Sequence, residues 1–320
     1  MPKMNTTKYE DIEPTVALFF PSKSVKRSHH YESMFTQDIA LGLVPYSGIS
    51  SSKNITTEIE ASDTDRLLAQ SVLHSVSRFE GRGDIESCIF NAIRKIAENI
   101  SWSGCAHFEV LHGKKQVYLL GFTSVNLYKL PLYYLQIVPR EDRGIWGRKG
   151  SLIRDSKIWR IEIPSELGGL KEYKKTLNML QNHNSIGPRF FQKDIERGIT
   201  NNYFDFNKYQ RENSISLNRA TTNWGWNRRD RNQEYCTEYY TVYKEIRFKY
   251  AQAVLIKHIV SEINSLFKRI ELDAVVNVFG KPSPSEIMQL EKDLWLGRIV
   301  FDEALDVLYG RESLSESSVQ

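Results

Sequence analysis

Few residues in this sequence have the types and spacing that catalysis or metal binding requires. Cys105 and His107 lie two positions apart, a pairing that suggests a thiol nucleophile and its base. Residues two apart on a strand share a face without being placed for proton transfer, so we interpret Cys105 as a buried structural cysteine. His107 and His112 differ by an odd number of positions and would face opposite sides of one strand. We therefore predict no metal site and no cofactor.

A second chemical motif consists of Asp155 and Lys157, which precede an apolar run at 158–163. A restriction-type nuclease places a carboxylate and a lysine two residues apart on a strand. Such triplets arise by chance in most chains of this length, so the motif alone is a weak signal. We therefore keep a nucleic-acid-acting protein, either a nuclease or a phage-defence component, as the alternative hypothesis. Gly168-Gly169 opens a helical stretch, yet no glycine-rich phosphate-binding run accompanies it. We predict that the chain is not an enzyme and has no catalytic residue.

Aromatic and cationic residues gather in the polar segment 192–236. Flat rings and positive charges together bind single strands or phosphate backbones, although a solvated loop can have the same composition. The candidate DNA-contacting residues are Trp224, Trp226, Arg228, Arg229 and Arg231.

The overall composition is that of a protein that can bury a sizeable core. The 320 residues are 41% hydrophobic and 26% charged, and the length leaves the domain count at one or two. The 43 basic and 39 acidic residues give a net charge of +4, which excludes a histone-like protein and makes any nucleic-acid contact local. Three scattered cysteines indicate no disulfide framework, and the apolar run Val16 to Phe20 is too short for a signal core or a membrane span. We expect a cytoplasmic protein without membrane contact.

The elements that must position these residues begin at about residue 84. Residues 1–83 are rich in Ser, Thr, Asp and Lys, and we predict an extended N-terminal arm that docks through its apolar clusters. Isoleucines at helical spacing predict an amphipathic helix over 85–100, which Asp84 would cap. Short apolar runs predict strands at 106–111, 116–122, 127–138 and 158–163, followed by a helix at 170–181. The fold class is therefore α+β, with a small mixed β body at 84–191 and a flanking amphipathic helix.

The longest periodic pattern follows the polar connecting segment 192–236 and predicts one long helix over 237–270. Such a helix is on the order of 50 Å long. Its apolar seam requires a partner, either the body of its own chain or the same helix in a neighbour. The candidate oligomer seam consists of Tyr239, Tyr243, Ile246, Tyr250, Ala253, Ile256, Val260 and Ile263. A capping box at 283–286 begins a C-terminal helical hairpin, so that 237–310 forms one helical region and 311–320 a loose tail.

The order of these features resembles the portal (head-tail connector) proteins of tailed bacteriophages. The segment Ser103 to Val110 after the first helix is similar to the family's helix-then-Gly-x-Ala-x-aromatic-Glu pattern. Trp159 to Pro164 with Leu167-Gly168-Gly169 resembles the strand, proline and glycine turn that precede a core helix in portals. The resemblance covers about residues 85–310. The chain is shorter than most portals, and 192–236 shows no clear stem and clip elements.

The resemblance implies a mechanical function without catalytic residues. Portal proteins form a closed ring, here of about twelve copies, at one capsid vertex. Double-stranded DNA passes through the ring during packaging and ejection, and terminase, capsid and connector proteins are the implied partners in the virion. A channel for DNA of any sequence needs a mild, repeated charge rather than base-reading groups. A third hypothesis is an interaction scaffold whose long helix pairs with an unrelated partner.

Overall fold

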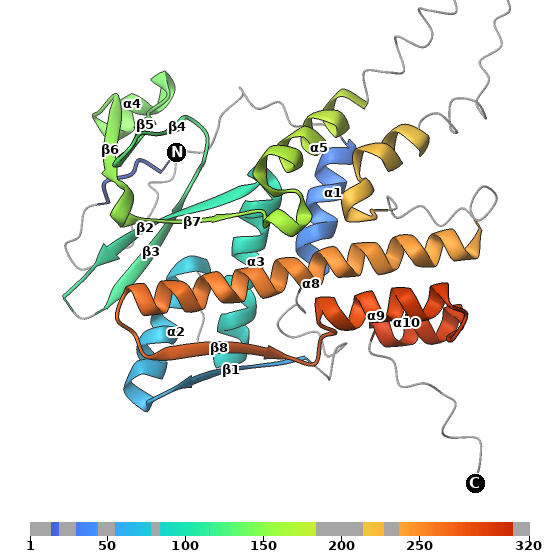
Figure 1. The fold of residues 1–320 in the computed structure, drawn as a ribbon. Coiled ribbons are helices and arrows are strands. Elements are labelled where there is room, and N and C mark those ends of the chain that lie inside the picture. Colours follow the sequence, from blue (N-terminus) through green and yellow to red (C-terminus); the bar gives the residue numbers. More distant parts are fainter. Residues whose placement is uncertain are drawn as a thin grey trace, which may run out of the picture.

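The computed structural model describes residues 14–18, 30–43, 55–77, 84–114, 116–183, 214–226 and 237–309 (Figure 1). The helices are α1 (His30–Leu41), α2 (Asp63–Ser77), α3 (Ile85–Ser103), α4 (Arg143–Trp146), α5 (Gly169–His183), α8 (Glu238–Arg269), α9 (Pro284–Trp295) and α10 (Phe301–Tyr309). The strands are β1 (Thr56–Ala61), β2 (Cys105–His112), β3 (Val117–Phe122), β4 (Leu127–Lys129), β5 (Tyr133–Ile137), β6 (Gly150–Arg154), β7 (Ile158–Glu162) and β8 (Ala274–Phe279). The mixed α+β class with small sheets confirms the coarser part of the predicted fold.

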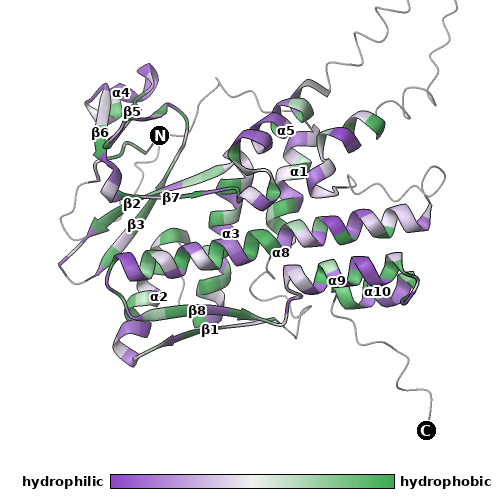
Figure 2. Cartoon of the chain, in the orientation of Figure 1, coloured by the Kyte–Doolittle hydropathy of each residue, from purple (hydrophilic) through white to green (hydrophobic). Residues whose placement is uncertain are grey.

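Three small antiparallel sheets form the β part of the described residues. The central sheet has the order β3-β2-β7, the outer sheet has the order β4-β5-β6, and β1 pairs with β8 in a third sheet. The predicted strand at 127–138 is two strands, because Pro131 lies in the turn between β4 and β5. Strands β2, β3 and β8 are coloured mainly as hydrophobic in Figure 2, and β2 is buried in all but its last residue.

Helix α3 lies at the centre of the core and is longer than the predicted 85–100. The Asp84 side chain accepts a hydrogen bond from the Ser87 backbone N–H at its first turn, as predicted. The helix ends at Gly104, whose φ of 80° is a conformation that favours glycine. The isoleucines that defined the pattern are all buried and pack in one cluster with residues of α1, α2, β2 and α8.

Helix α8 confirms the predicted long helix, and its 32 residues correspond to a length of about 48 Å. Near its N-terminus, Val242 and Ile246 pack on α9 and α10. Farther along, Ile259 and Phe267 belong to the main core. At its C-terminus, Arg269 donates a hydrogen bond of 2.9 Å to the Ile158 carbonyl at the start of β7. The helix therefore joins the sheets at one end of the molecule to the C-terminal hairpin at the other (Figure 1).

The predicted helical hairpin is present as α9 and α10. The Ser283 side chain accepts from the Glu286 backbone N–H, and the Glu286 carboxylate accepts from the Ser283 N–H at 2.6 Å, so the predicted capping box is formed with Pro284 in the first turn. Strand β8, which the sequence analysis did not predict, lies between α8 and this hairpin.

The predicted extended N-terminal arm is wrong for residues 30–43 and 55–77. Phe35 and Ile39 of α1, and Val72 and Leu73 of α2, are fully or almost fully buried in the main core. Strand β1 pairs with β8 from the opposite end of the chain. These residues form helices and a strand because their apolar side chains complete the core around α3. The polar composition of the segment as a whole gave no sign of this packing.

Residues 14–18, here called the strap, pass between the outer and central sheets. The Glu109 carboxylate of β2 accepts from the Thr15 and Val16 backbone N–H groups, each at 3.1 Å. The Gln136 amide of β5 accepts from the Ala17 N–H at 2.7 Å and donates to the Ala17 carbonyl at 2.9 Å. Val16 is buried in one cluster with residues of both sheets, so the strap fastens one sheet to the other.

Candidate functional site

The two tryptophans predicted to contact DNA are buried. Trp224 and Trp226 are each 1% exposed and pack edge-on against Phe35, with ring centroids 5.6 and 5.3 Å away. The Trp226 indole N–H donates to the Asp38 carboxylate at 2.8 Å. Neither ring presents a face to solvent, so the prediction that they stack on nucleic acid is wrong. Large aromatic side chains gain most from burial, so the residue type alone already favoured buried tryptophans.

The other predicted DNA contacts, Arg228, Arg229 and Arg231, lie outside the described residues.

The predicted oligomer seam of α8 is largely used within the chain. Ile246, Ile256 and Ile263 are buried against the chain's own core or hairpin, which contradicts their assignment to a subunit contact. Tyr239 lies 6.3 Å from the Tyr243 ring and 6.4 Å from the Trp295 ring of α9. The remaining seam residues, Tyr250, Ala253 and Val260, are partly buried and pack against the same clusters. The long apolar pattern therefore reflects packing of α8 on the body of its own chain, and not on the same helix of a neighbour.

The nuclease motif does not have the predicted geometry. Asp155 and Lys157 form a short 3-10 turn rather than a strand. Asp155 lines a cavity of about 750 Å³, here called the large cavity, between the outer sheet, β7 and the C-terminal end of α8, whereas Lys157 is not among its lining residues. Within the described ranges, no group of three or more His, Cys, Asp or Glu side chains is placed to hold a metal ion.

Cys105 and His107 both line a second, small cavity of about 240 Å³. Cys105 is buried, as predicted, and its thiol lies 3.6 Å from the Ser124 hydroxyl. His107 Nδ1 lies 2.9 Å from the same hydroxyl. Burial, followed by the positive charges of Arg160 and Lys174, lowers the pKa of His107 to about 3, so this imidazole is neutral at neutral pH. No pattern in the sequence points to Ser124, because a lone serine after a strand carries no signal.

Cations surround both cavities. Lys129, Arg160 and Lys174 line the small cavity, and none of the described residues in its wall is acidic. Lys129 and Arg160 also line the large cavity, together with Arg154 and Arg269. Arg160 forms an ion pair with Glu162. In the large cavity these four cations outnumber the two acidic residues, Asp155 and Glu262, so both cavities have an excess of positive charge that suits an anionic group.

The outer sheet presents apolar side chains to solvent on one face. Tyr128, Leu135 and Leu152 are direct cross-strand neighbours in one row, and Tyr128 and Leu152 are 53% and 54% exposed. The other face of the sheet is buried against the strap and the central sheet. Further exposed apolar residues lie in the β4–β5 turn and on α4, where Ile145 is 78% exposed. We define the outer-sheet surface as the exposed apolar residues of the sheet, of the β4–β5 turn and of α4, namely Tyr128, Leu132, Ile137, Ile145 and Leu152.

A second exposed apolar surface lies at the tip of the C-terminal hairpin. Trp295, the last residue of α9, is 75% exposed, although it is the residue type that gains most from burial. Leu296 and Val300 in the following loop are also exposed. We define the hairpin-tip surface as Trp295, Leu296 and Val300.

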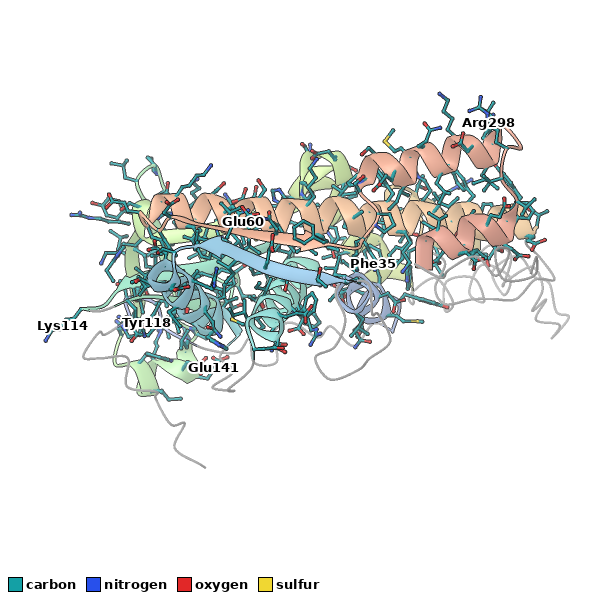
Figure 3. All side chains as sticks on the ribbon, turned by 90° about the horizontal axis from the view of Figure 1, so that it is seen from below. Phe35, Glu60, Lys114, Tyr118, Glu141 and Arg298 are labelled. Carbon is teal, nitrogen blue, oxygen red and sulfur yellow. The ribbon has the colours of Figure 1, made fainter. Side chains whose placement is uncertain are left out.

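These two surfaces lie at opposite ends of the molecule. Trp295 contacts Tyr239 in the first turn of α8, whereas Arg269 at the last turn contacts β7 beside the outer sheet. About 48 Å of helix therefore separates them. In a second view, Figure 3 shows Glu141, just before α4, at the lower left and Arg298 of the hairpin loop at the upper right, far from each other. The described part of the molecule therefore carries two unlike apolar surfaces near opposite ends of α8.

Comparison of the sequence with known protein families and with curated proteins gave no match. In the part of the chain that the structure describes, no helix is both long enough and apolar enough to cross a membrane.

Proposed function

We propose that the chain is a subunit of a portal-like ring, in which the outer-sheet surface of one copy contacts the hairpin-tip surface of the next. The observation that carries this proposal is the presence of two unlike apolar surfaces at opposite ends of one chain. Exposed apolar area of this kind is costly in water and is typical of contact sites. Two different surfaces associate head to tail, and such an arrangement closes into a ring when the rotation between subunits permits it.

The order of elements supports the portal assignment over other rings. An amphipathic helix followed by a strand, a proline and glycine turn before α5, one long helix and a terminal hairpin occur here in the order that portal proteins show. In this proposal, rings of about twelve copies conduct double-stranded DNA at a capsid vertex, in contact with terminase, capsid and connector proteins. The virion is then the location of the assembled protein.

Single charge substitutions on the two surfaces test this arrangement. Ile145→Asp and Trp295→Asp each place a charge at one contact and leave the other intact, so each variant is expected to lose the ring. Leu67→Asp, on an exposed residue of α2 outside both surfaces, is the matched control and should assemble like the unmodified chain. The oligomer mass from light scattering after size exclusion is the readout. Rings that persist in both contact variants would overturn the proposed contact.

Mixing the two variants distinguishes head-to-tail contact from contact between identical surfaces. The Ile145→Asp chain keeps an intact hairpin tip and the Trp295→Asp chain keeps an intact outer sheet. Head-to-tail association predicts that a mixture forms a dimer of one chain of each kind, while each variant alone stays monomeric. If like surfaces associated instead, each variant alone would form a dimer, and mixing would add nothing.

A second candidate function, nucleic-acid binding by the individual chain, is favoured by the cations around the two cavities. Lys174→Gln removes one charge from the small cavity and is expected to weaken binding to DNA of any sequence and to reduce its salt dependence. Lys175→Gln is the matched control, because Lys175 lies next to Lys174 on α5 and is paired with Glu172 outside the cavity. Equal DNA affinity of the two variants would argue against this function.

A further inference from the structure

The strap is bound as a peptide ligand is bound. Its backbone N–H groups donate hydrogen bonds to the Glu109 and Gln136 side chains, and its Ala17 carbonyl accepts one from Gln136. No backbone-to-backbone hydrogen bond joins it to a strand of the described chain. The strap can therefore leave its site without breaking a β ladder.

The site requires an occupant. Glu109 and Gln136 are both fully buried, and an empty site would leave a carboxylate and an amide without hydrogen-bond partners in an apolar cluster. Water could replace the backbone N–H groups, but it could not replace the apolar contacts of Val16 and Ala17, which are also fully buried. An extended peptide with a small and a β-branched residue restores every contact, and a second copy of this chain supplies that peptide.

The strap also lies directly behind the proposed subunit contact. Ala17 packs in one small cluster with Val138 and with Trp146 of α4. Ile145, the neighbour of Trp146, is the most exposed member of the outer-sheet surface. Gln136, one of the two side chains that hold the strap, lies on β5, and the opposite face of that sheet carries Tyr128 and Leu152 of the outer-sheet surface. A neighbour docked on the outer-sheet surface is therefore close to the strap site.

We propose that the strap is exchanged between subunits, so that residues 14–18 of one copy occupy the Glu109–Gln136 site of the adjacent copy in the assembled ring. This inference rests on the proposed ring. Exchange conserves every contact of the strap, and for identical chains its cost is limited to the loss of the intramolecular connection. The 11 residues at 19–29 join the strap to α1 and have a fully extended length of about 40 Å.

Photocrosslinking of full-length chains tests the exchange. Leu18→p-benzoylphenylalanine places a photoreactive side chain at the edge of the cluster that surrounds the strap. This chain is assembled together with an equal amount of unmodified chain that carries a mass tag, and the mixture is irradiated. Thr15→p-benzoylphenylalanine repeats the test at the other side of Val16, in case the first substitution disturbs the cluster. Leu67→p-benzoylphenylalanine on α2 is the control for contacts unrelated to the strap.

The proposal predicts a crosslinked product of one modified and one tagged chain, with the bond mapped to β5 or β6 of the tagged chain. Rings whose crosslinks lie only within the modified chain would overturn the exchange and leave the ring intact. An exchanged dimer without rings would support the exchange and overturn the proposed function. A protein that stays monomeric with crosslinks inside one chain would overturn both.

Discussion

The hydrogen bonds between Gln136 and the strap predict how much stability the protein loses when this side chain is removed. Gln136→Ala removes two hydrogen bonds to Ala17, of 2.7 and 2.9 Å, and leaves the buried N–H and carbonyl of Ala17 without partners. Each unsatisfied buried group costs about 1–3 kcal/mol, so the two groups together would destabilise a docked strap by about 2–6 kcal/mol. The strap can instead leave its site, which limits the loss to the free energy of strap docking.

Urea denaturation measures this loss as a change in the unfolding free energy, with both chains at the same protein concentration. Gln289→Ala is the matched control, because that exposed side chain makes one hydrogen bond to Asp293 and its loss should cost less than about 0.5 kcal/mol. Hydrogen exchange at the Ala17 amide should rise in the Gln136 variant alone. If both variants lose the same small amount of stability and the Ala17 amide stays protected from exchange, Gln136 does not hold the strap.

Further predictions concern a turn and a buried histidine. Gly104→Ala should destabilise the fold by about 2–4 kcal/mol in urea denaturation, because the residue has φ of +80° and a Cβ would lie 2.6 Å from the Leu170 side chain. Gly144→Ala, with open space around it, is the control and should change little, so equal losses would contradict the steric argument. Burial lowers the pKa of His107 from 6.5 to about 3 in the folded protein, so on acidification the unfolded chain binds a proton at this residue before the folded protein does. The contribution of neutral His107 to the unfolding free energy is therefore complete above about pH 6.5 and should fall by up to about 1.4 kcal/mol per pH unit below that pH. His107→Gln should lose that part of the pH dependence in unfolding measurements from pH 7 to 4, and an unchanged slope would refute the assignment.

The elements with local signals are those that the sequence predicts well. Helix α3 has isoleucines at a regular spacing and a capping aspartate, and α9 has a complete capping box at Ser283. Helix α8 has an uninterrupted apolar pattern over its whole length. Each of these signals lies within the element that it specifies, so no knowledge of distant residues is needed.

The missed elements depend on contacts between distant parts of the chain. Strand β1 is stabilised by β8, with Ile59 opposite Val276, and neither short segment has a distinctive pattern alone. The strap depends on Glu109 and Gln136, which lie in other elements. Sequence alone also could not say which partner covers the seam of α8, since an apolar stripe has the same pattern whether it packs on its own chain or on a neighbour.

The mass and shape of the purified full-length protein test the central claim most directly. Light scattering after size exclusion, with negative-stain images of the same peak, measures both at once. The proposed function predicts closed rings of about twelve copies with a central opening, in which the two apolar surfaces are no longer exposed. A stable monomer with both surfaces open to solvent, at concentrations where the contact should be saturated, would contradict it.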